Sequence, residues 1–171
     1  MNRFLFALSL VLFAALSRLL PHPPNVAPIT ALALFGGVYF GRRLAFVVPL
    51  LAMFLSDLLI GLHGGMLWVY ASFAAIVCIG FWLRRHPGVM TTVGASMAGS
   101  VLFFVLTNFG MWVMPEGLYP HTPAGLAECY TAAIPFFRNT LLGDLAYCGL
   151  LFGLFELGKR LVPSLRESVT R

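Results

Sequence analysis

The sequence LAFVVPLLAMFLSDLLIGL at residues 44–62 decides the class of fold. It carries a single charge, Asp57, and its length is close to the ~20 apolar residues that an α-helix needs to cross a bilayer. The whole chain has the same character, with 60% hydrophobic and 10% charged residues, whereas soluble domains contain about 25% charged residues. We therefore predict an integral membrane protein.

Six apolar segments are candidate helices, at residues 4–20, 29–41, 44–62, 66–83, 89–113 and 131–161. We expect an all-α polytopic membrane protein with six transmembrane helices in one integral membrane domain, residues 1–171. The segment at 29–41 is short, roughly 20 Å of helix at 1.5 Å per residue. The segment at 4–20 resembles a signal peptide, but no small-residue cleavage site follows it, so we expect a retained helix.

The positions of the basic residues predict an orientation. Nine of the 11 Lys and Arg residues flank the predicted helices on one side: Arg3, Arg42, Arg43, Arg84, Arg85, Lys159, Arg160, Arg166 and Arg171. Because positive residues concentrate in cytoplasmic loops, we expect both termini in the cytoplasm. The net charge of +5 is explained by this pattern and does not indicate nucleic-acid binding. The expected surroundings are a lipid bilayer.

The two remaining basic residues, Arg18 and Arg138, lie inside predicted helices near their outer ends, where charges are costly and normally have partners. Other polar side chains fall at the same level, which predicts a pocket open to the extracytoplasmic side. Its expected substrate-binding residues are Arg18, His22, Asn25, Asp57, His63, Tyr70, Asn108, Trp112, Arg138 and Asn139. The alternative is that both arginines reach lipid headgroups, one of them paired with Asp57.

Arg138 is the residue on which the pocket hypothesis depends most. Its guanidinium offers five donors in a planar fork, and we expect Asp57 to accept on one side and a substrate carboxylate, amide or phosphate on the other. Asp144 lies near the middle of the membrane and has two interpretations. It is either a proton-coupling carboxylate or a packing carboxylate bonded to Tyr147 or a serine.

No catalytic or metal-binding pattern is present. The chain has no G-x-S-x-G, H-E-x-x-H or P-loop sequence, and Cys78, Cys129 and Cys148 have no zinc or disulfide spacing. We therefore expect no catalytic residue, no cofactor and no protein-bound metal.

A short helix between Thr122 and Tyr130 is expected at the outer membrane surface.

Four stretches carry a resemblance to a known family: PHPPNVAPITALALFGGVYFG, SDLLIGLHGGMLWVYASF, TNFGMW and AAIPFFRNTLLGDLAY. They resemble a bacterial family of small proteins proposed to act in transport, whose substrate is unassigned. In size and helix number the chain is also similar to solitary, cobalamin-type S components of energy-coupling factor transporters. That similarity implies an S-component-like bundle in which His22, Asp57 and Arg138 bind substrate. Tyr70 stands where those proteins have a cysteine that meets cobalt.

The resemblance implies capture of a small vitamin-like molecule at the bacterial inner membrane, with an energy-coupling ATPase module as a partner in trans. Three functions stay open on the sequence. The first is a substrate-capture or transport protein, the second is a non-transporting scaffold or assembly protein, and the third is an intramembrane enzyme that uses Asp57 and His22.

Overall fold

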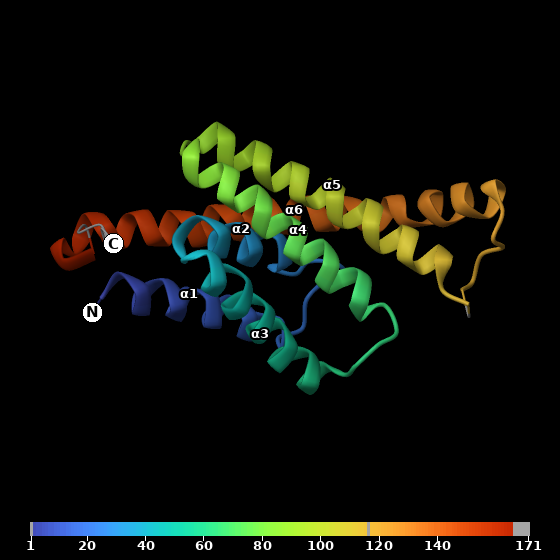
Figure 1. Cartoon of the computed structure of the whole chain (residues 1–171), viewed down its shortest axis with the longest axis horizontal. Coiled ribbons are helices and arrows are strands. Elements are labelled where there is room, and N and C mark those ends of the chain that lie inside the picture. The colour runs from blue at the N-terminus through green and yellow to red at the C-terminus, as the bar shows by residue number, and fades with distance from the viewer. Residues whose placement is uncertain (1, 116, 166–171) are drawn as a thin grey trace.

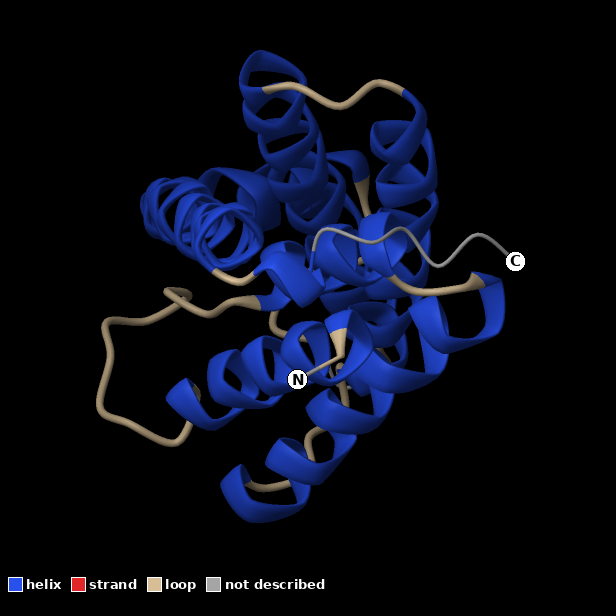
Figure 2. Cartoon of the chain, turned by 90° about the vertical axis from the view of Figure 1, so that its left-hand side faces the viewer, coloured by secondary structure: helices blue, strands red, loops and turns tan. Residues whose placement is uncertain are grey.

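The protein is built from helices alone in the described residues, 2–115 and 117–165, of a computed structural model. The helices are α1 (Arg3–Ser17), α2 (Ile29–Tyr39), α3 (Arg42–Ile60), α4 (Met66–Arg85), α5 (Val89–Val113) and α6 (Pro123–Leu161), and a 3-10 turn, η1 (Pro163–Leu165), follows. The expected all-α fold with six helices is confirmed. Figure 2 shows only helices and loops among these residues.

Four helices, α3 to α6, are long and apolar enough to cross a membrane, and the protein is therefore a membrane protein by length and composition. Large apolar side chains point outward over much of the bundle. Leu59, Leu67 and Met90, for example, are 73%, 75% and 81% exposed. A water-soluble monomer rarely exposes contiguous apolar surface on this scale, so these side chains fit contact with lipid.

The ends of the helices sort into two groups (Figure 1). The start of α1, the α2–α3 and α4–α5 turns and the end of α6 lie at one end of the bundle, and the α3–α4 and α5–α6 connections lie at the other. The first group holds every described basic residue that the sequence placed on one side. We call it the basic end.

The short helix α2 is the centre of the bundle. Residues 30–37 are all buried, and α2 packs against α3, α4, α5 and α6. Its closest neighbour is α4, because a Cβ at Gly37 would lie only 2.7 Å from the Cα of Gly80. With 11 residues, α2 is about 16 Å long. Its first turn lies inside the bundle, because Thr30 is only 1% exposed.

Two predicted helix ends are wrong. The helix α1 stops at Ser17 and not at Leu20, because residues 18–20 form i→i−3 backbone hydrogen bonds and a proline-rich stretch follows. The helix α6 begins at Pro123 and not at Thr131. The Thr122 side chain caps it by accepting from the Gly125 N–H at 3.1 Å, a preferred arrangement with proline in the first turn.

The separate short helix that we expected over residues 122–130 is thus the first part of α6. Pro135 removes one backbone hydrogen bond but does not end the helix. The bounds of α2 to α5 agree with the predicted bounds to within two residues at each end.

Candidate functional site

A buried ion pair lies where the chain leaves α1. Arg18 Nη2 donates to Asp57 Oδ1 of α3 at 2.7 Å, and the two side chains are only 11% and 3% exposed. The second carboxylate oxygen, Asp57 Oδ2, accepts from the hydroxyl of Tyr70 on α4 at 2.7 Å. Arg18 also donates to the hydroxyl of Ser56. We call Arg18, Ser56, Asp57 and Tyr70 the Arg18 cluster.

The cluster is a charged site in an apolar bundle. Each charge taken out of water costs several kcal/mol, and only close ionic contacts and hydrogen bonds offset that cost. Here each oxygen of Asp57 has a partner, and Arg18 Nη1 also lies 3.4 Å from the carbonyl of Met53. Next to the cluster, the Ser17 hydroxyl donates to the Tyr147 hydroxyl of α6 at 3.1 Å. Groups from four helices thus meet at the end of α1.

Arg138 does not belong to this cluster. It is exposed and forms no hydrogen bond or ion pair with another described residue, so the expected pairing of Arg138 with Asp57 is wrong. Arg18 takes that place. The neighbouring residue Asn139 does reach the chain after α1, because its Nδ2 donates to the carbonyl of Pro24 at 3.1 Å.

The loop residues of the predicted pocket point elsewhere. His22, Asn25 and His63 are all exposed. His22 Nδ1 lies 2.6 Å from the carbonyl of Leu20 in its own loop. Asn25 has a backbone φ of 63°, a left-handed conformation that asparagine adopts more readily than most residues. The structure therefore does not bring these three side chains to the Arg18 cluster.

The predicted site residues of α5 bind carbonyls of their own helix and of the α5–α6 connection. Asn108 Nδ2 donates to the carbonyl of Phe104 at 2.8 Å. Trp112 Nε1 donates to the carbonyl of Pro120 in the α5–α6 connection at 2.9 Å. Of the predicted site residues on α4 and α5, only Tyr70 forms a hydrogen bond to the Arg18–Asp57 pair within the described residues.

Asp144 forms a second buried polar group, between α2, α5 and α6. The side chain is 2% exposed, and its Oδ2 accepts from the Ser100 hydroxyl at 2.6 Å. Thr30, in the first turn of α2, directs its hydroxyl and its backbone N–H to the same carboxylate. The sequence suggested a serine partner for Asp144 but not Thr30, since nothing in the sequence shows that α2 begins at this depth.

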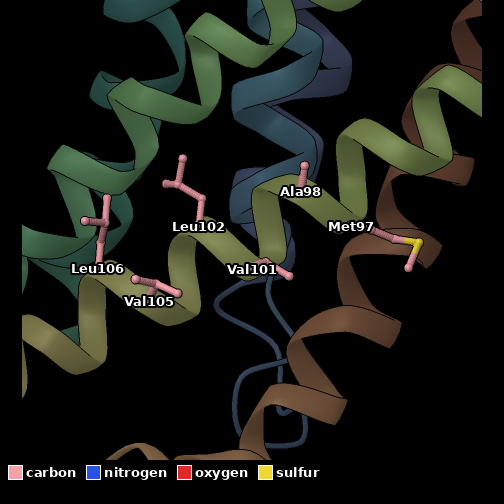
Figure 3. A pocket seen from close by; sticks show the side chains of 6 residues that line it. All are labelled: Met97, Ala98, Val101, Leu102, Val105 and Leu106. Carbon is pink, nitrogen blue, oxygen red and sulfur yellow. The ribbon is translucent and has the colours of Figure 1, made fainter. Parts of the chain in front are cut away.

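Each of three surface pockets is lined by residues other than the predicted substrate-binding residues. One is formed by apolar side chains of α5 alone: Met97, Ala98, Val101, Leu102, Val105 and Leu106 (Figure 3). It offers no polar group to a ligand. Another lies at the basic end and has charged residues at its rim. No group of three metal-ligating side chains occurs in residues 2–115 and 117–165.

Comparison with known proteins gives one result. The model of a family of unknown function (DUF6580) matches residues 1–165, so the chain belongs to that family. No curated protein and no solved structure matches the chain.

Proposed function

We propose that this member of a family of unknown function captures a small, vitamin-like molecule from outside the bacterial inner membrane and serves its transport. The observation that carries the proposal is the Arg18 cluster, a charged and hydrogen-bonded group buried among apolar helices. Ionisable residues inside a membrane bundle are rare and typically mark the path of a substrate or an ion.

The chain next to the cluster supports the same proposal. Residues 18–28 form an irregular, proline-rich connection between two short helices. In many transporters the substrate site is formed where short or interrupted helices end inside the membrane. In this proposal the end of α1 and the start of α2 form such a site.

The chemistry of the cluster suggests the class of substrate group. The guanidinium of Arg18 is a planar donor that suits a carboxylate, amide or phosphate. Asp57 binds it and is itself held by the hydroxyl of Tyr70. A substrate would compete with Ser56 and Asp57 for its donors. In this proposal the outer ends of α3 and α4 face the periplasm and both termini lie in the cytoplasm.

The source of energy is a further part of the proposal. The sequence contains no nucleotide-binding motif, so uptake against a gradient would need an ATPase module in trans, as the resemblance to S components implies. Without such a partner the protein would move its substrate only downhill.

One observation favours the non-transporting scaffold as the alternative. Both oxygens of Asp57 already have partners within the chain, as they would in a purely structural ion pair. The two functions differ in whether the cluster affects ligand affinity or only stability.

The first experiment is native mass spectrometry of the protein purified from its own host, followed by binding assays with cobalamin, riboflavin, thiamin and adenine. We expect one small molecule to copurify. Ligand affinity and thermal stability are then measured for Tyr70→Phe and, as the matched control, for Tyr130→Phe, which loses a hydrogen bond to the carbonyl of Val105.

The two functions predict different results for these variants. Capture predicts at least a tenfold loss of affinity for Tyr70→Phe and none for Tyr130→Phe. A scaffold predicts no specific ligand, or equal affinity in both variants with only a change in melting temperature, and either result would reject the proposal.

A further inference from the structure

A cleft opens at the basic end of the bundle, between the end of α2, the α4–α5 turn and α6. Its volume is about 690 Å³. The α4–α5 turn and the end of α6, which line it, lie at the opposite end of the bundle from the α3–α4 and α5–α6 connections (Figure 1), and none of the residues of the Arg18 cluster lines it. An inference about this cleft therefore uses none of the residues of the proposed substrate site, and it shares with the proposed function only the cytoplasmic location of the basic end.

The part of the cleft that lies farther from the basic end is apolar. Val93, Leu145 and Phe152 form its walls. Gly149 and Gly153 form its floor, and a Cβ built at either glycine meets no atom within 4 Å. Glycines four residues apart can let two helices approach closely, but no helix of the described residues packs against this pair.

The rim of the cleft is charged. Lys159 and Arg160 supply two positive charges, and Glu156 supplies one negative charge, so the excess is one positive charge. Glu156 Oε1 lies 2.6 Å from Lys159 Nζ and accepts a hydrogen bond from the Tyr39 hydroxyl at 3.1 Å. These contacts offset the one negative charge that the described residues place at the cleft.

The cleft is thus amphipathic along the membrane normal. From Leu145 to Arg160 the helix α6 rises about 22 Å, from an apolar floor to a basic rim. Basic pockets between transmembrane helices on the cytoplasmic side bind the headgroups of anionic lipids. A soluble anion would use only the rim and would leave the apolar floor unfilled, whereas an anionic lipid uses both parts.

We propose that this cleft binds one anionic phospholipid, with an acyl chain along Gly149 and Gly153 and the phosphate at Lys159 and Arg160. The test uses delipidated protein in detergent, titrated with phosphatidylglycerol, phosphatidylcholine or glycerol 1-phosphate. Bound lipid is counted by native mass spectrometry, and the melting temperature is measured in parallel.

The variants separate the floor from the rim. Gly149→Leu/Gly153→Leu adds side chains to the floor at two positions where a Cβ meets no atom within 4 Å, and the control is Gly94→Leu, because Gly94 is equally open at Cβ but lies outside the cleft on α5. Arg160→Gln removes a rim charge, and Arg43→Gln removes an exposed charge of α3 near the same end. Circular dichroism checks that each variant is folded.

We expect one phosphatidylglycerol per protein, retained at least tenfold better than phosphatidylcholine. Filling the floor should lower that affinity at least tenfold, Arg160→Gln should lower it about fivefold, and both controls should bind like the wild type. Three results would overturn the proposal: equal retention of the two lipids, unchanged binding in the filled variant, or full stabilisation by glycerol 1-phosphate alone. If the wild type is dimeric, and the filled variant is monomeric but binds lipid unchanged, the cleft belongs to a contact with a helix of a second copy instead.

Discussion

Replacement of Asp144 by leucine is the sharpest test of how this bundle is held together. The helix α2 begins inside the protein with Pro28 at its N-cap and no side-chain cap of its own. The first backbone N–H groups of any helix lack partners within that helix. The carboxylate of Asp144 accepts from the Thr30 N–H and hydroxyl, so a side chain of α6 caps α2.

The expected loss of stability follows from these contacts. Asp144→Leu leaves two donors of Thr30 without a partner, and an unpaired buried donor costs roughly 1–3 kcal/mol. Ser100 loses less, because its hydroxyl also lies 3.0 Å from the carbonyl of Ser96. We therefore expect Asp144→Leu to lower the free energy of unfolding by about 2–4 kcal/mol. Asp144→Asn keeps an acceptor and should cost about 1 kcal/mol through the lost charge at the helix N-terminus.

The free energy of unfolding is measured in detergent by SDS titration, followed by circular dichroism. Ser100→Ala is the matched control, because it removes only one interhelical hydrogen bond, a change worth about 0.6 kcal/mol on average in membrane proteins. If Asp144→Leu unfolds within about 0.5 kcal/mol of the wild type, the range typical of neutral surface changes, the capping role is refuted. Loss of proton-dependent uptake in Asp144→Asn, with unchanged stability, would instead support the proton-coupling interpretation.

Three further predictions concern packing, capping and topology. A Cβ at Gly80 would lie 2.7 Å from a backbone oxygen of α2, so Gly80→Ala should cost about 1–3 kcal/mol of unfolding free energy by overpacking, whereas Gly94→Ala should be neutral in the same titration. Asn2 accepts from two backbone N–H groups of α1, and Asn2→Ala should cost about 0.5–2 kcal/mol, which Asn2→Asp should largely restore. A cysteine at Leu118 should react with an impermeant thiol reagent added from outside, and one at Arg85 only after permeabilisation; the reverse pattern would invert the topology.

Hydropathy was sufficient to predict the number of helices and most of their ends. The ends that were missed depend on local hydrogen bonding and not on hydropathy. Leu19 and Leu20 are apolar, yet their N–H groups bond to residues three positions earlier, so α1 has already ended. Residues 123–130 are moderately polar, but the cap at Thr122 and the absence of a break at Pro135 make them part of α6.

The sequence predicted how far along their helices the site residues lie, but not which side of the helix each one faces. Arg18, Asp57 and Arg138 were all placed near the outer ends of their helices, and the first two do meet. Arg138 does not, because the buried face of α6 includes Thr140 and Asp144. At 100° per residue, Arg138 lies about 160° around the helix from Thr140. A single sequence gives the level of a residue from charge and hydropathy, but the side on which a long apolar helix is covered depends on its neighbours.

The short length of α2 explains why charged residues from two other helices lie against it. Asp144 of α6 reaches the first turn. Arg84 of α4 donates to the carbonyl of Gly37 at 3.0 Å and also to that of Phe40. The negative charge thus lies at the positive end of the helix dipole and the positive charge at the negative end.

The same two contacts assign a second role to a residue that the sequence explained by topology alone. Arg84 belongs to the basic end that predicts a cytoplasmic location, and it also satisfies the last carbonyls of α2. Because the two ends of α2 are about 16 Å apart, the contributions of Asp144 and Arg84 to stability should add. A central helix that is fixed at both ends is a rigid support, against which the irregular chain at residues 18–28 and the Arg18 cluster can hold one geometry.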